Sequence, residues 1–420
     1  MTGRAGATAQ SNFFVGNRAG TNGLVRLKSL QNVIVTDMRP IYLDYNASTP
    51  IDPRVIDSMR AALEQGYGNP SSTHWAGAPA KSLLEASRRQ VADLLQCAPE
   101  EVIFTSGGSE ANNLALKGVF FARRGRPVHI ITTRIEHPSI LAPCAFLERE
   151  GARVTHLPVD AAGLVDPEEL RRAIAPDTAL VSIMHANNET GTVEPIEECA
   201  RIAREHGILF HTDAAQSVGK IPTRVSELGV DLLSIAGHKL YAPKGVGALY
   251  VRAGTRLEPL IHGAGHESGR RAGTESALLA TALGTASTLA ADLSSIHTTR
   301  DLCDQLWKGL EDHFGNRIVL NGHPERRLPN TLNVSFVGYT GADILAAVKD
   351  IAASTGSACH SGRVELSPVL RAMGISEEVG RGAIRFSLGR GTTAAEIHEA
   401  VERILAATRS PGIRLLTGDD

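Results

Sequence analysis

Short apolar runs alternate with longer amphipathic segments along most of the first 250 residues. The runs predict strands, and the segments between them are long enough to be single crossover helices. Strands connected in this way form a mostly parallel sheet with helices on both faces, so the sequence predicts an α/β fold. Ligands bind such sheets at the carboxyl ends of the strands. The predicted strands are 102–105, 128–132, 154–158, 180–185, 208–212, 232–235 and 247–252, with helices at 53–65, 77–96, 110–121, 139–150, 167–174, 195–206 and 275–293.

The last third of the chain has a different pattern. Strands near Asn330–Phe336 and Ile384–Leu388 alternate with helical spacing, which predicts a smaller α+β domain. The short strand Ile41–Asn46 is expected to join it. The predicted helices here are 342–349, 366–373 and 394–407. The predicted organisation is a leader over 1–38, a large domain over 53–294, a small domain made of 39–52 and 295–408, and a tail over 409–420.

Composition excludes several classes of protein. The net charge of −2 gives no basic field for nucleic acid, and no run of 18 apolar residues offers a membrane span. The 5 cysteines are scattered without Cys-x-x-Cys spacing, which argues against disulfides and structural zinc and favours a reducing compartment such as the cytoplasm. No His-Glu-x-x-His motif occurs, so we expect no protein-bound metal.

Residues 1–37 are basic, with no acidic residue before Asp37. They contain no continuous apolar core of the kind that a secretory signal needs. Three interpretations stay open for this segment, namely an organelle transit peptide, a disordered leader, and an upstream start codon with Met38 as the working one.

A lysine follows the predicted strand 232–235. Lys239 lies in Gly-His-Lys-Leu-Tyr-Ala-Pro-Lys-Gly, where Pro243 and Gly245 exclude a regular helix, so we expect Lys239 on a loop at a strand end. Partial desolvation lowers the pKa of a lysine amine, and the free lone pair can then bond to a carbonyl carbon. A solvated loop lysine is the alternative interpretation.

Two glycines stand between serines directly after the predicted strand 102–105. In Ser106-Gly-Gly-Ser109 the glycines let the backbone approach a ligand, and the next helix offers unpaired N–H groups. This combination favours binding of one phosphate, although the spacing matches neither a Walker loop nor the dinucleotide-binding pattern. An ordinary glycine turn with Ser109 as the N-cap is the alternative.

An aspartate follows the predicted strand 208–212. A buried carboxylate is costly without a cation, and a protonated heterocyclic nitrogen is a suitable partner for Asp213. Lys239 lies one crossover later, so both side chains can face the same end of the sheet. A helix N-cap is the alternative role for Asp213.

Four more residues are candidates for chemistry. His137 and Asn188 each follow a strand, where an imidazole can stack on a flat ring and move protons and an amide can bind ring substituents. Arg385 suits a carboxylate clamp, with a solvent-facing arginine as the alternative. Cys359 lies among small and polar residues beside His360, where a thiol on a mobile loop can act as a nucleophile, whereas the other cysteines fall in or beside apolar helical patterns.

The order of these motifs resembles one known family. The sequence contains, in turn, Ser-Gly-Gly-Ser, Glu-His, Asn-Asn-Glu-Thr-Gly, Asp-Ala-Ala-Gln-Ser, Gly-His-Lys with Pro-Lys-Gly, Gly-Thr, Gly-Ser-Ala-Cys and Arg-Phe-Ser. It resembles the cysteine desulfurases of the nitrogen-fixation and iron–sulfur-cluster type, within the class V aminotransferase family, over roughly residues 40–405. Asp213–Gly245 is the most specific part, and Cys359 separates the chain from plain aminotransferases. The implied fold is that of aspartate aminotransferase.

The resemblance also implies a cofactor and a role for each motif. Pyridoxal 5'-phosphate would be bound covalently to Lys239, which would also move the α-proton of the substrate, and Cys359 would take the sulfur of L-cysteine as a persulfide, release L-alanine and pass the sulfur to an acceptor protein. The chain would form a homodimer. Around the cofactor, Asp213 would pair with the pyridinium nitrogen, His137 would stack on the ring, Gln216 and Asn188 would reach the phenolic oxygen, and Gly108, Ser109, His238 and the second subunit's Thr274 would hold the phosphate, while Arg385 and Asn46 would bind the substrate.

Three departures from the family pattern limit the resemblance. Ala236 stands where many of these enzymes have a serine that contacts the phosphate, and Ser268 replaces a frequent arginine. The segments Ala358–Ser361 and Ser367–Leu370 are also similar to selenocysteine lyases, so selenocysteine is an alternative substrate. Another class V pyridoxal enzyme and a non-catalytic scaffold are weaker alternatives, because the first gives the cysteine loop no role and the intact lysine, aspartate and histidine argue against the second.

Overall fold

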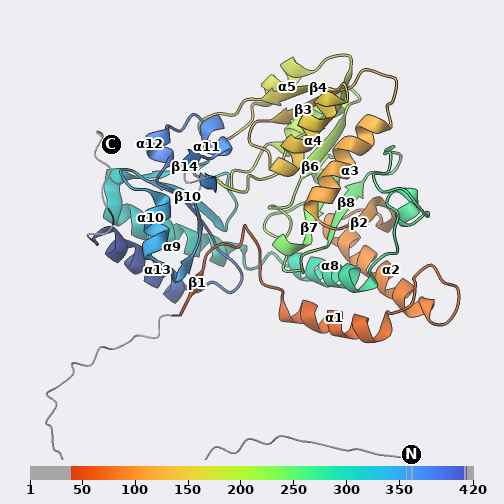
Figure 1. Ribbon diagram of the computed structural model, residues 1–420, viewed down its shortest axis with the longest axis horizontal. Coiled ribbons are helices and arrows are strands. Elements are labelled where there is room, and N and C mark those ends of the chain that lie inside the picture. The colour runs from red at the N-terminus through yellow and green to blue at the C-terminus, as the bar shows by residue number, and fades with distance from the viewer. Residues whose placement is uncertain (1–38, 356, 361–362, 411–412, 414–420) are drawn as a thin grey trace, which may run out of the picture. The chain divides into compact units, whose positions relative to one another are not determined.

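The computed structural model describes the chain from residue 39 almost to its end (Figure 1). The predicted leader and most of the predicted tail lie outside the described residues. For Cys359 the backbone is described and the side chain is not. The described residues are 39–355, 357–360, 363–410 and 413, without the side chains of 357–360 and 363–365.

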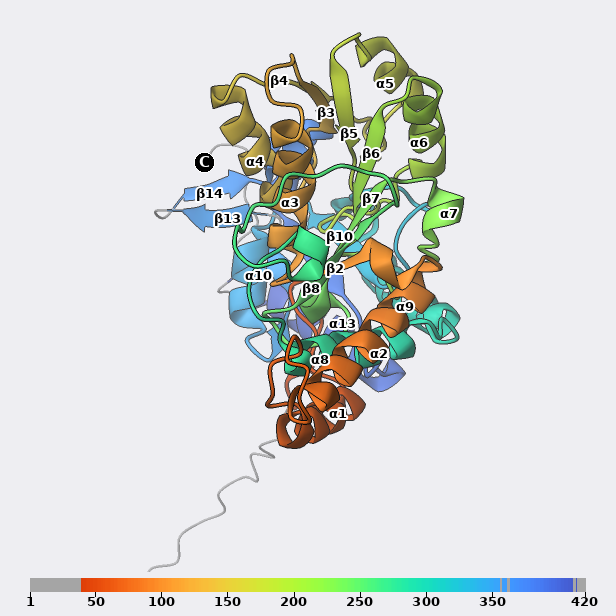
Figure 2. The same cartoon turned by 90° about the vertical axis from the view of Figure 1, so that its right-hand side faces the viewer.

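A seven-stranded sheet forms the centre of the larger part of the fold (Figures 1 and 2). One strand, β8, is antiparallel to both of its neighbours, and every other neighbouring pair is parallel. The central strands are buried along their whole length, which explains their continuous apolar runs. The predicted mostly parallel sheet is confirmed. In spatial order its strands are β2 (Val102–Thr105), β8 (Gly247–Val251), β7 (Leu232–Ala236), β6 (Leu209–Asp213), β5 (Thr178–Ser182), β3 (His129–Thr133) and β4 (Arg153–Leu157).

Helices cover both faces of this sheet, because successive side chains of a strand point to opposite faces. Ile131 belongs to a core shared with α2 (Gly77–Leu95), α6 (Ile196–Glu205) and α8 (Ala277–Ala290). Its neighbour Ile130 belongs to the core on the other face, which includes residues of α3 and α4. The remaining helices of this part are α1 (Pro53–Gln65), α3 (Gly108–Phe121), α4 (Pro138–Arg149), α5 (Pro167–Ala173) and α7 (Val225–Leu228), with 3-10 turns at η1 (Pro99–Glu101), η2 (Gly237–Lys239) and η3 (Glu267–Gly269).

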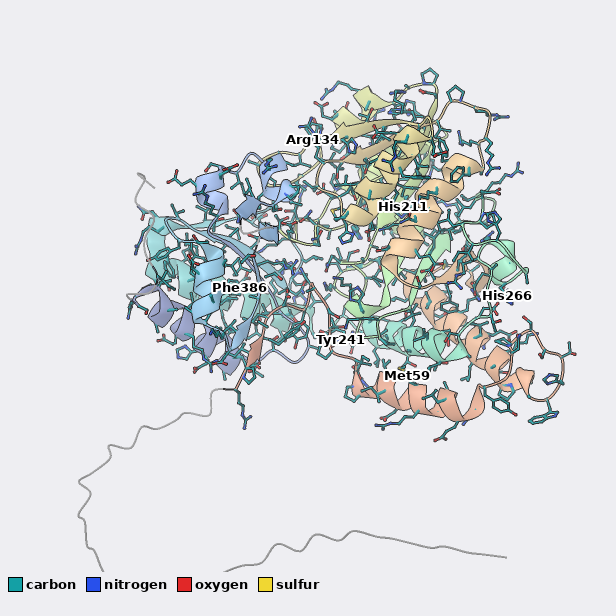
Figure 3. The ribbon with its side chains drawn as sticks, viewed as in Figure 1. Met59, Arg134, His211, Tyr241, His266 and Phe386 are labelled. Carbon is teal, nitrogen blue, oxygen red and sulfur yellow. The ribbon has the colours of Figure 1, made fainter. Side chains whose placement is uncertain are left out.

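A smaller, antiparallel four-stranded sheet has a core of its own. Phe314, Phe336 and Phe386 are central to this core, where helices cover the sheet (Figure 3 labels Phe386). The boundaries of the two domains stay a prediction. In spatial order the strands are β12 (Ser354–Thr355), β15 (Ala383–Ser387), β10 (Thr331–Phe336) and β9 (Ile318–Leu320), and the helices nearby are α9 (Ile296–Phe314), η4 (Gly315–Arg317), α10 (Gly341–Ala347), α11 (Pro368–Ala372), α12 (Glu377–Gly380) and α13 (Ala394–Thr408).

The first described segment joins the smaller sheet and then crosses to the larger one. β1 (Ile41–Tyr42) pairs in parallel with β11 (Ile351–Ala352), and Asp44 forms a bridge with Ser387 of β15. The predicted strand over 41–46 is therefore too long, because the chain turns after Asp44 toward the end of β7. None of the described helices is long and apolar enough to cross a membrane.

One local prediction was wrong and one helix was missed. Cys359 lies in a hairpin rather than a loop, since β13 (Ser357–His360) pairs with β14 (Arg363–Leu366). Lys239 lies outside a regular helix at a strand end, as predicted, and ends the 3-10 turn η2, in which Leu240 N–H bonds back to the carbonyl of Gly237. Helix α9 was not predicted, although its buried residues Leu302, Leu306 and Leu310 have helical spacing.

Close backbone approach at Gly247 positions the turn that precedes α3. A Cβ at Gly247 would lie 2.7 Å from the Cα of Gly107. We predict that Gly247→Ala lowers the free energy of unfolding by about 1–3 kcal/mol and weakens binding of the pyridoxal 5'-phosphate that the resemblance implies, because the turn must move. Urea unfolding and titration with pyridoxal 5'-phosphate check this. Gly265→Ala is the matched control, since a Cβ there meets no atom within 4 Å, and equal effects of the two variants would contradict the prediction.

Candidate active site

Most of the predicted site residues line one pocket at the carboxyl ends of the strands of the larger sheet. Thr274 lines a neighbouring pocket, which shares Ser106, Gly245 and Val246 with the first. The side chain of Cys359 lies outside the described part of the structure. The predicted residues in the first pocket are Asn46, Gly108, Ser109, His137, Asn188, Asp213, Gln216, His238, Lys239 and Arg385.

Lys239 presents its amine to this pocket from the turn after β7. Its Nζ donates hydrogen bonds to the backbone carbonyls of Asn46 and Ala47, both in the segment that follows β1. Burial, together with the nearby positive charge of Arg385, lowers the pKa of Lys239 to about 8. A substantial fraction of the amine is therefore neutral and nucleophilic at moderately alkaline pH.

Asp213 ends β6, the strand next to β7, and Lys239 follows β7. Its side chain is only 6% exposed, and its two oxygens accept hydrogen bonds from Asn112 Nδ2 at 2.7 Å and from the N–H of Ala215 at 2.9 Å. Both donors are neutral amides, and no ion pair to Asp213 occurs among the described residues. A buried carboxylate in this setting favours a cationic ligand atom in the pocket.

The start of α3 forms the anion-binding end of the pocket. The helix has 14 residues and begins directly after the glycine turn, so its first N–H groups have no partners within the helix. Gly107 is the N-cap, so the alternative role predicted for Ser109 is wrong. Ala236 lies against the helix start, where a Cβ on Gly108 would be 3.1 Å from the Cβ of Ala236, so the turn approaches the end of β7 closely.

Two basic residues lie near this end of the pocket. Burial lowers the pKa of His238 to about 4, so its imidazole is neutral at physiological pH and can donate a hydrogen bond without a charge. Lys244 also lines the pocket and brings a positive charge that the sequence analysis did not include. The helix start, His238 and Lys244 together suit a phosphate group.

His137 caps the N-terminus of α4. Its Nδ1 accepts a hydrogen bond from the N–H of Ser139 at 3.1 Å and lies 2.7 Å from Ser139 Oγ. Burial lowers the pKa of His137 and Lys239 adds to this effect, whereas Asp213 acts in the opposite direction.

Hydrogen bonds of Asn46 and Gln216 connect the smaller sheet to the larger one. Asn46 is 1% exposed, and its amide donates to Thr331 Oγ1 and accepts from Lys220 and Asn330. Gln216 Nε2 donates to the carbonyl of Asn46, and Gln216 Oε1 accepts from Lys220 Nζ at 2.9 Å. The side chain of Asn46 thus already has protein partners on both its nitrogen and its oxygen, so a substrate contact would require these bonds to rearrange.

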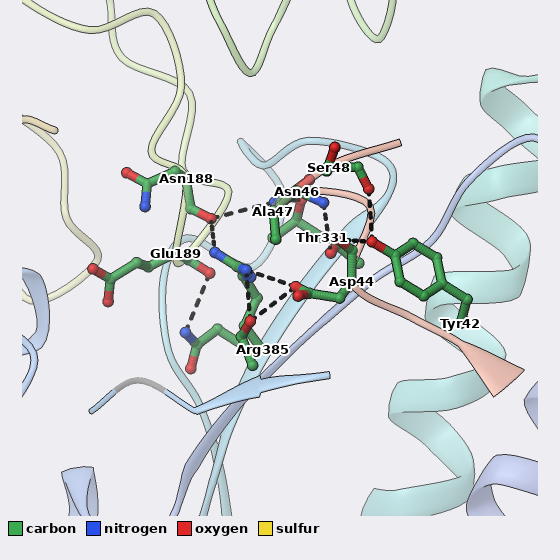
Figure 4. Close-up of polar contacts among 12 residues, drawn as sticks. Tyr42, Asp44, Asn46, Ala47, Ser48, Asn188, Glu189, Thr331 and Arg385 are labelled. Atoms are coloured by element: carbon green, nitrogen blue, oxygen red, sulfur yellow. Dashed lines mark hydrogen bonds and ion pairs between the residues drawn. The ribbon is translucent and has the colours of Figure 1, made fainter. Parts of the chain in front are cut away.

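Arg385 on β15 is held by an acidic partner (Figure 4). Its Nη2 lies 2.7 Å from Asp44 Oδ1 and 3.0 Å from Ser354 Oγ, and its Nη1 donates to the carbonyl of Asn188 at 2.9 Å. Nε is buried and has no hydrogen-bond partner. The alternative of a solvent-facing arginine is wrong, since the side chain is buried and faces the pocket.

The loop after η3 is tied to the anion-binding end. Arg271 forms an ion pair with Glu110 of α3, whose carboxylate also accepts the N–H of Ser106. Arg88 of α2 forms a second, more deeply buried pair with Glu267 at 2.7 Å. Ser268 has a φ of +56° beside Glu267, so the loop bends sharply there, and Thr274 is exposed further along it.

Four cysteines other than Cys359 have described side chains, and all are free. Burial raises the pKa of Cys97, Cys144 and Cys199 to about 12 and that of Cys303 to about 11. These thiols are protonated at physiological pH, which makes them poor nucleophiles. Among the described residues, no group of three His, Cys, Asp or Glu could hold a metal ion.

Four residues in or beside the pocket were not predicted from the sequence, namely Asn112, Ser139, Lys220 and Asp44. Asn112 follows the anion-binding turn by about one helical turn, and Lys220 follows Gln216 by four residues, so spacing could have indicated both. Asp44 and Arg385 lie far apart in the chain, and only the fold shows that they pair.

Comparisons with known proteins agree with this geometry. Residues 41–399 match the model of the aminotransferase class-V family. The cysteine desulfurase IscS of Dictyoglomus turgidum is 46% identical over 379 residues, which cover 89% of this chain and 96% of that protein. A solved NifS-like protein has a TM-score of 0.82 at 37% identity, covering 87% of this chain and 98% of that one. The structure of SspA in complex with cysteine has a TM-score of 0.74 at 38% identity, with coverages of 83% and 98%.

The chain therefore belongs to the class V aminotransferase family. Members of this family are pyridoxal-phosphate enzymes, and pyridoxal 5'-phosphate is the cofactor of this chain. The pocket fits that molecule, because it offers an amine at Lys239, a buried carboxylate at Asp213 and a helix start for the phosphate. The predicted fold of aspartate-aminotransferase type is confirmed as well.

The lowered pKa of Lys239 predicts how the covalent attachment of pyridoxal phosphate depends on pH. In the protein freed of its cofactor, covalent attachment of pyridoxal phosphate to Lys239 should accelerate with rising pH and level off above about 8, because the neutral amine is the reactive form. Borohydride trapping followed by peptide mass spectrometry measures the rate. An ordinary lysine would continue to gain reactivity up to about pH 10, and such a profile would contradict the effect of burial.

Proposed function

We propose that this chain is a cysteine desulfurase that converts L-cysteine to L-alanine and transfers the sulfur, through a persulfide on Cys359, to an acceptor protein. The main observation in support is that Lys239, with its lowered pKa, shares one pocket with Asp213, which forms no ion pair with any of the residues described. The relatives named cysteine desulfurase and the cysteine-bound SspA structure point to the same substrate.

Different residues of the pocket would bind different parts of pyridoxal phosphate. Lys239 would anchor it, Asp213 would accept a hydrogen bond from the protonated ring nitrogen, and the helix start at Gly108 and Ser109, with His238, would hold the phosphate. Gln216 and Asn188 would bind the phenolic oxygen, and His137 would lie beside the ring. The bound cofactor supplies an electron-withdrawing ring that stabilises negative charge on the carbon beside the substrate nitrogen.

Lys239 moves the proton of the substrate. A neutral amine near pH 8 is a competent base, and the carbonyls of Asn46 and Ala47 lie within reach of its Nζ to stabilise the protonated form. The same amine can then return the proton, so Lys239 needs no second base among the pocket residues.

Arg385 orients the substrate by its carboxylate. Nη1 of Arg385 uses one hydrogen on the carbonyl of Asn188, so its second hydrogen is available to a carboxylate. Asp44 and Ser354 hold the guanidinium in place before the substrate arrives, which lowers the entropic cost of binding. Asn46 would reach the substrate only after giving up one of its present hydrogen bonds.

Cys359 takes the sulfur. Its thiolate bonds to the substrate sulfur, the carbon–sulfur bond breaks, and the electron pair of that bond remains with the carbon fragment, which gains a proton and leaves as alanine. The hairpin β13–β14 gives Cys359 a support that connects directly to Ser367, whose Oγ donates to Glu189 beside the pocket. An acceptor protein with a nucleophilic thiol would then remove the sulfur from the persulfide.

The assembly and the cellular location belong to the same proposal. A homodimer would bring the second subunit's Thr274 to the phosphate, and the exposure of Thr274 beside the anion-binding end supports this. The proposed place of action is the cytoplasm, since the described cysteines are free thiols. We expect no nucleic acid or membrane partner. Selenocysteine is not favoured as the substrate, because the relatives are named for cysteine.

Replacement of Cys359 separates the persulfide step from cofactor chemistry. Cys359→Ser should lower alanine formation from L-cysteine by about 100-fold or more, because a hydroxyl does not accept the sulfur, while the visible absorbance of the bound cofactor stays unchanged. Alanine analysis and absorbance spectra check both parts. Cys97→Ser is the matched control and should keep full activity, because that thiol has a pKa of about 12. Full activity of Cys359→Ser would exclude the persulfide mechanism.

A further inference from the structure

A row of four polar side chains runs from Asp213 to His137. Asn112 Nδ2 lies 2.7 Å from Asp213 Oδ2 and 2.8 Å from Ser139 Oγ, and Ser139 Oγ lies 2.7 Å from His137 Nδ1. The four residues come from the end of β6, the first turns of α3 and the start of α4, so the fold brings them together from distant parts of the sequence. All four line the candidate active site.

The direction of every hydrogen bond in this row is fixed. A carboxylate only accepts hydrogen bonds, so Asn112 must turn its nitrogen toward Asp213. The second hydrogen of that nitrogen then goes to Ser139 Oγ, and the hydroxyl proton of Ser139 is left for His137 Nδ1. Asn112 is 1% exposed and Asp213 6%, so water does not compete at this end of the row, and the backbone N–H of Ser139 constrains the more exposed end at His137.

The backbone supplies an independent constraint on the same nitrogen. The N–H of Ser139 donates to His137 Nδ1 at 3.1 Å, because His137 is the N-cap of α4. An N–H group cannot accept a hydrogen bond, so Nδ1 must present a lone pair. A proton on Nδ1 would oppose this N–H and the hydroxyl of Ser139, and would also remove the cap, which is worth about 1 kcal/mol.

We propose that Ser139 and Asn112 are positioning residues that hold His137 as a neutral imidazole with its proton on Nε2. In this state His137 offers the pocket a hydrogen-bond donor and has no free lone pair with which to act as a base. The proton-moving role predicted for His137 is thereby restricted, and Lys239 remains as the base of the pocket.

The charged groups around His137 do not overturn this state. Burial is the largest influence and lowers its pKa, Lys239 acts in the same direction from the end of β7, and Asp213 opposes both from the end of β6. His238 is neutral at physiological pH. The tautomer follows from the hydrogen bonds alone, whereas its contribution to catalysis rests on the proposed function.

Nitrogen-15 NMR of the full-length protein labelled at histidine tests the inference directly. The His137 signal is assigned by its loss in His137→Asn and followed against pH, both with bound cofactor and after its removal. We expect the Nε2–H tautomer throughout the neutral range in the wild-type protein. A proton on Nδ1, or an equal mixture of tautomers, would overturn the proposal.

Two substitutions at one position separate a positioning role from a structural one. Ser139→Ala keeps the backbone cap and removes the hydroxyl donor, so the pKa of His137 should rise by about one unit. Ser139→Thr keeps a hydroxyl and should leave the pKa near its wild-type value. If the pKa of His137 is unchanged in Ser139→Ala, Ser139 does not position His137. Asn112→Ala should also raise the pKa of His137. If that variant does not fold, the comparison of Ser139→Ala with Ser139→Thr tests the proposal by itself.

The assay of sulfur release on the same samples keeps the two proposals apart. Nε2–H in a protein that does not produce alanine from L-cysteine would leave the inference standing and refute the proposed function. A proton on Nδ1 in a protein that does produce alanine from L-cysteine would refute the inference and leave the proposed function standing.

Discussion

The buried carboxylate of Asp213 is the constraint on which the rest of the site depends. It ends a strand in the middle of the sheet, where an uncompensated charge would cost several kcal/mol. In the part of the chain that the structure describes, its hydrogen-bond donors are the amides of Asn112 and Ala215, and it forms no ion pair. This arrangement favours a cationic ring nitrogen over a neutral ligand. Asn112 contacts Asp213 directly, and Ser139 connects Asn112 to His137.

A second set of contacts connects the two sheets through the segment after β1. Asp44 holds Arg385 of the smaller sheet, and the carbonyls of Asn46 and Ala47 accept from Lys239 of the larger sheet. The group that would bind the substrate carboxylate and the group that would move its proton are thus both held by the stretch Asp44–Ala47. Figure 4 shows the contact of Arg385 with Asp44. Lys220, buried beside Asn46, adds a third basic group to this segment.

The sequence allowed much of this arrangement to be predicted, because strand ends in a parallel sheet meet at one edge. Lys239, Asp213, His137 and Asn188 were each selected from an apolar run followed by a polar residue, and all line one pocket. The partners of these groups could not be predicted, since a contact such as Asp44 with Arg385 depends on how two sheets pack. The 3-10 turn at Lys239 and the hairpin around Cys359 were not predicted for another reason. They depend on backbone hydrogen bonds that residue types alone do not specify.

Ser139 performs two tasks with two different parts of one residue, and this has an evolutionary consequence. Every amino acid except proline supplies the backbone N–H that caps α4, so the helix tolerates almost any replacement there. Only a hydroxyl continues the row of hydrogen bonds to Asn112 and Asp213. Drift at this position would therefore change the proton affinity of the histidine while leaving the fold intact. A single nucleotide change could retune the acidity of the pocket, which makes position 139 a place where descendants of this protein could diverge in pH optimum before they diverge in structure.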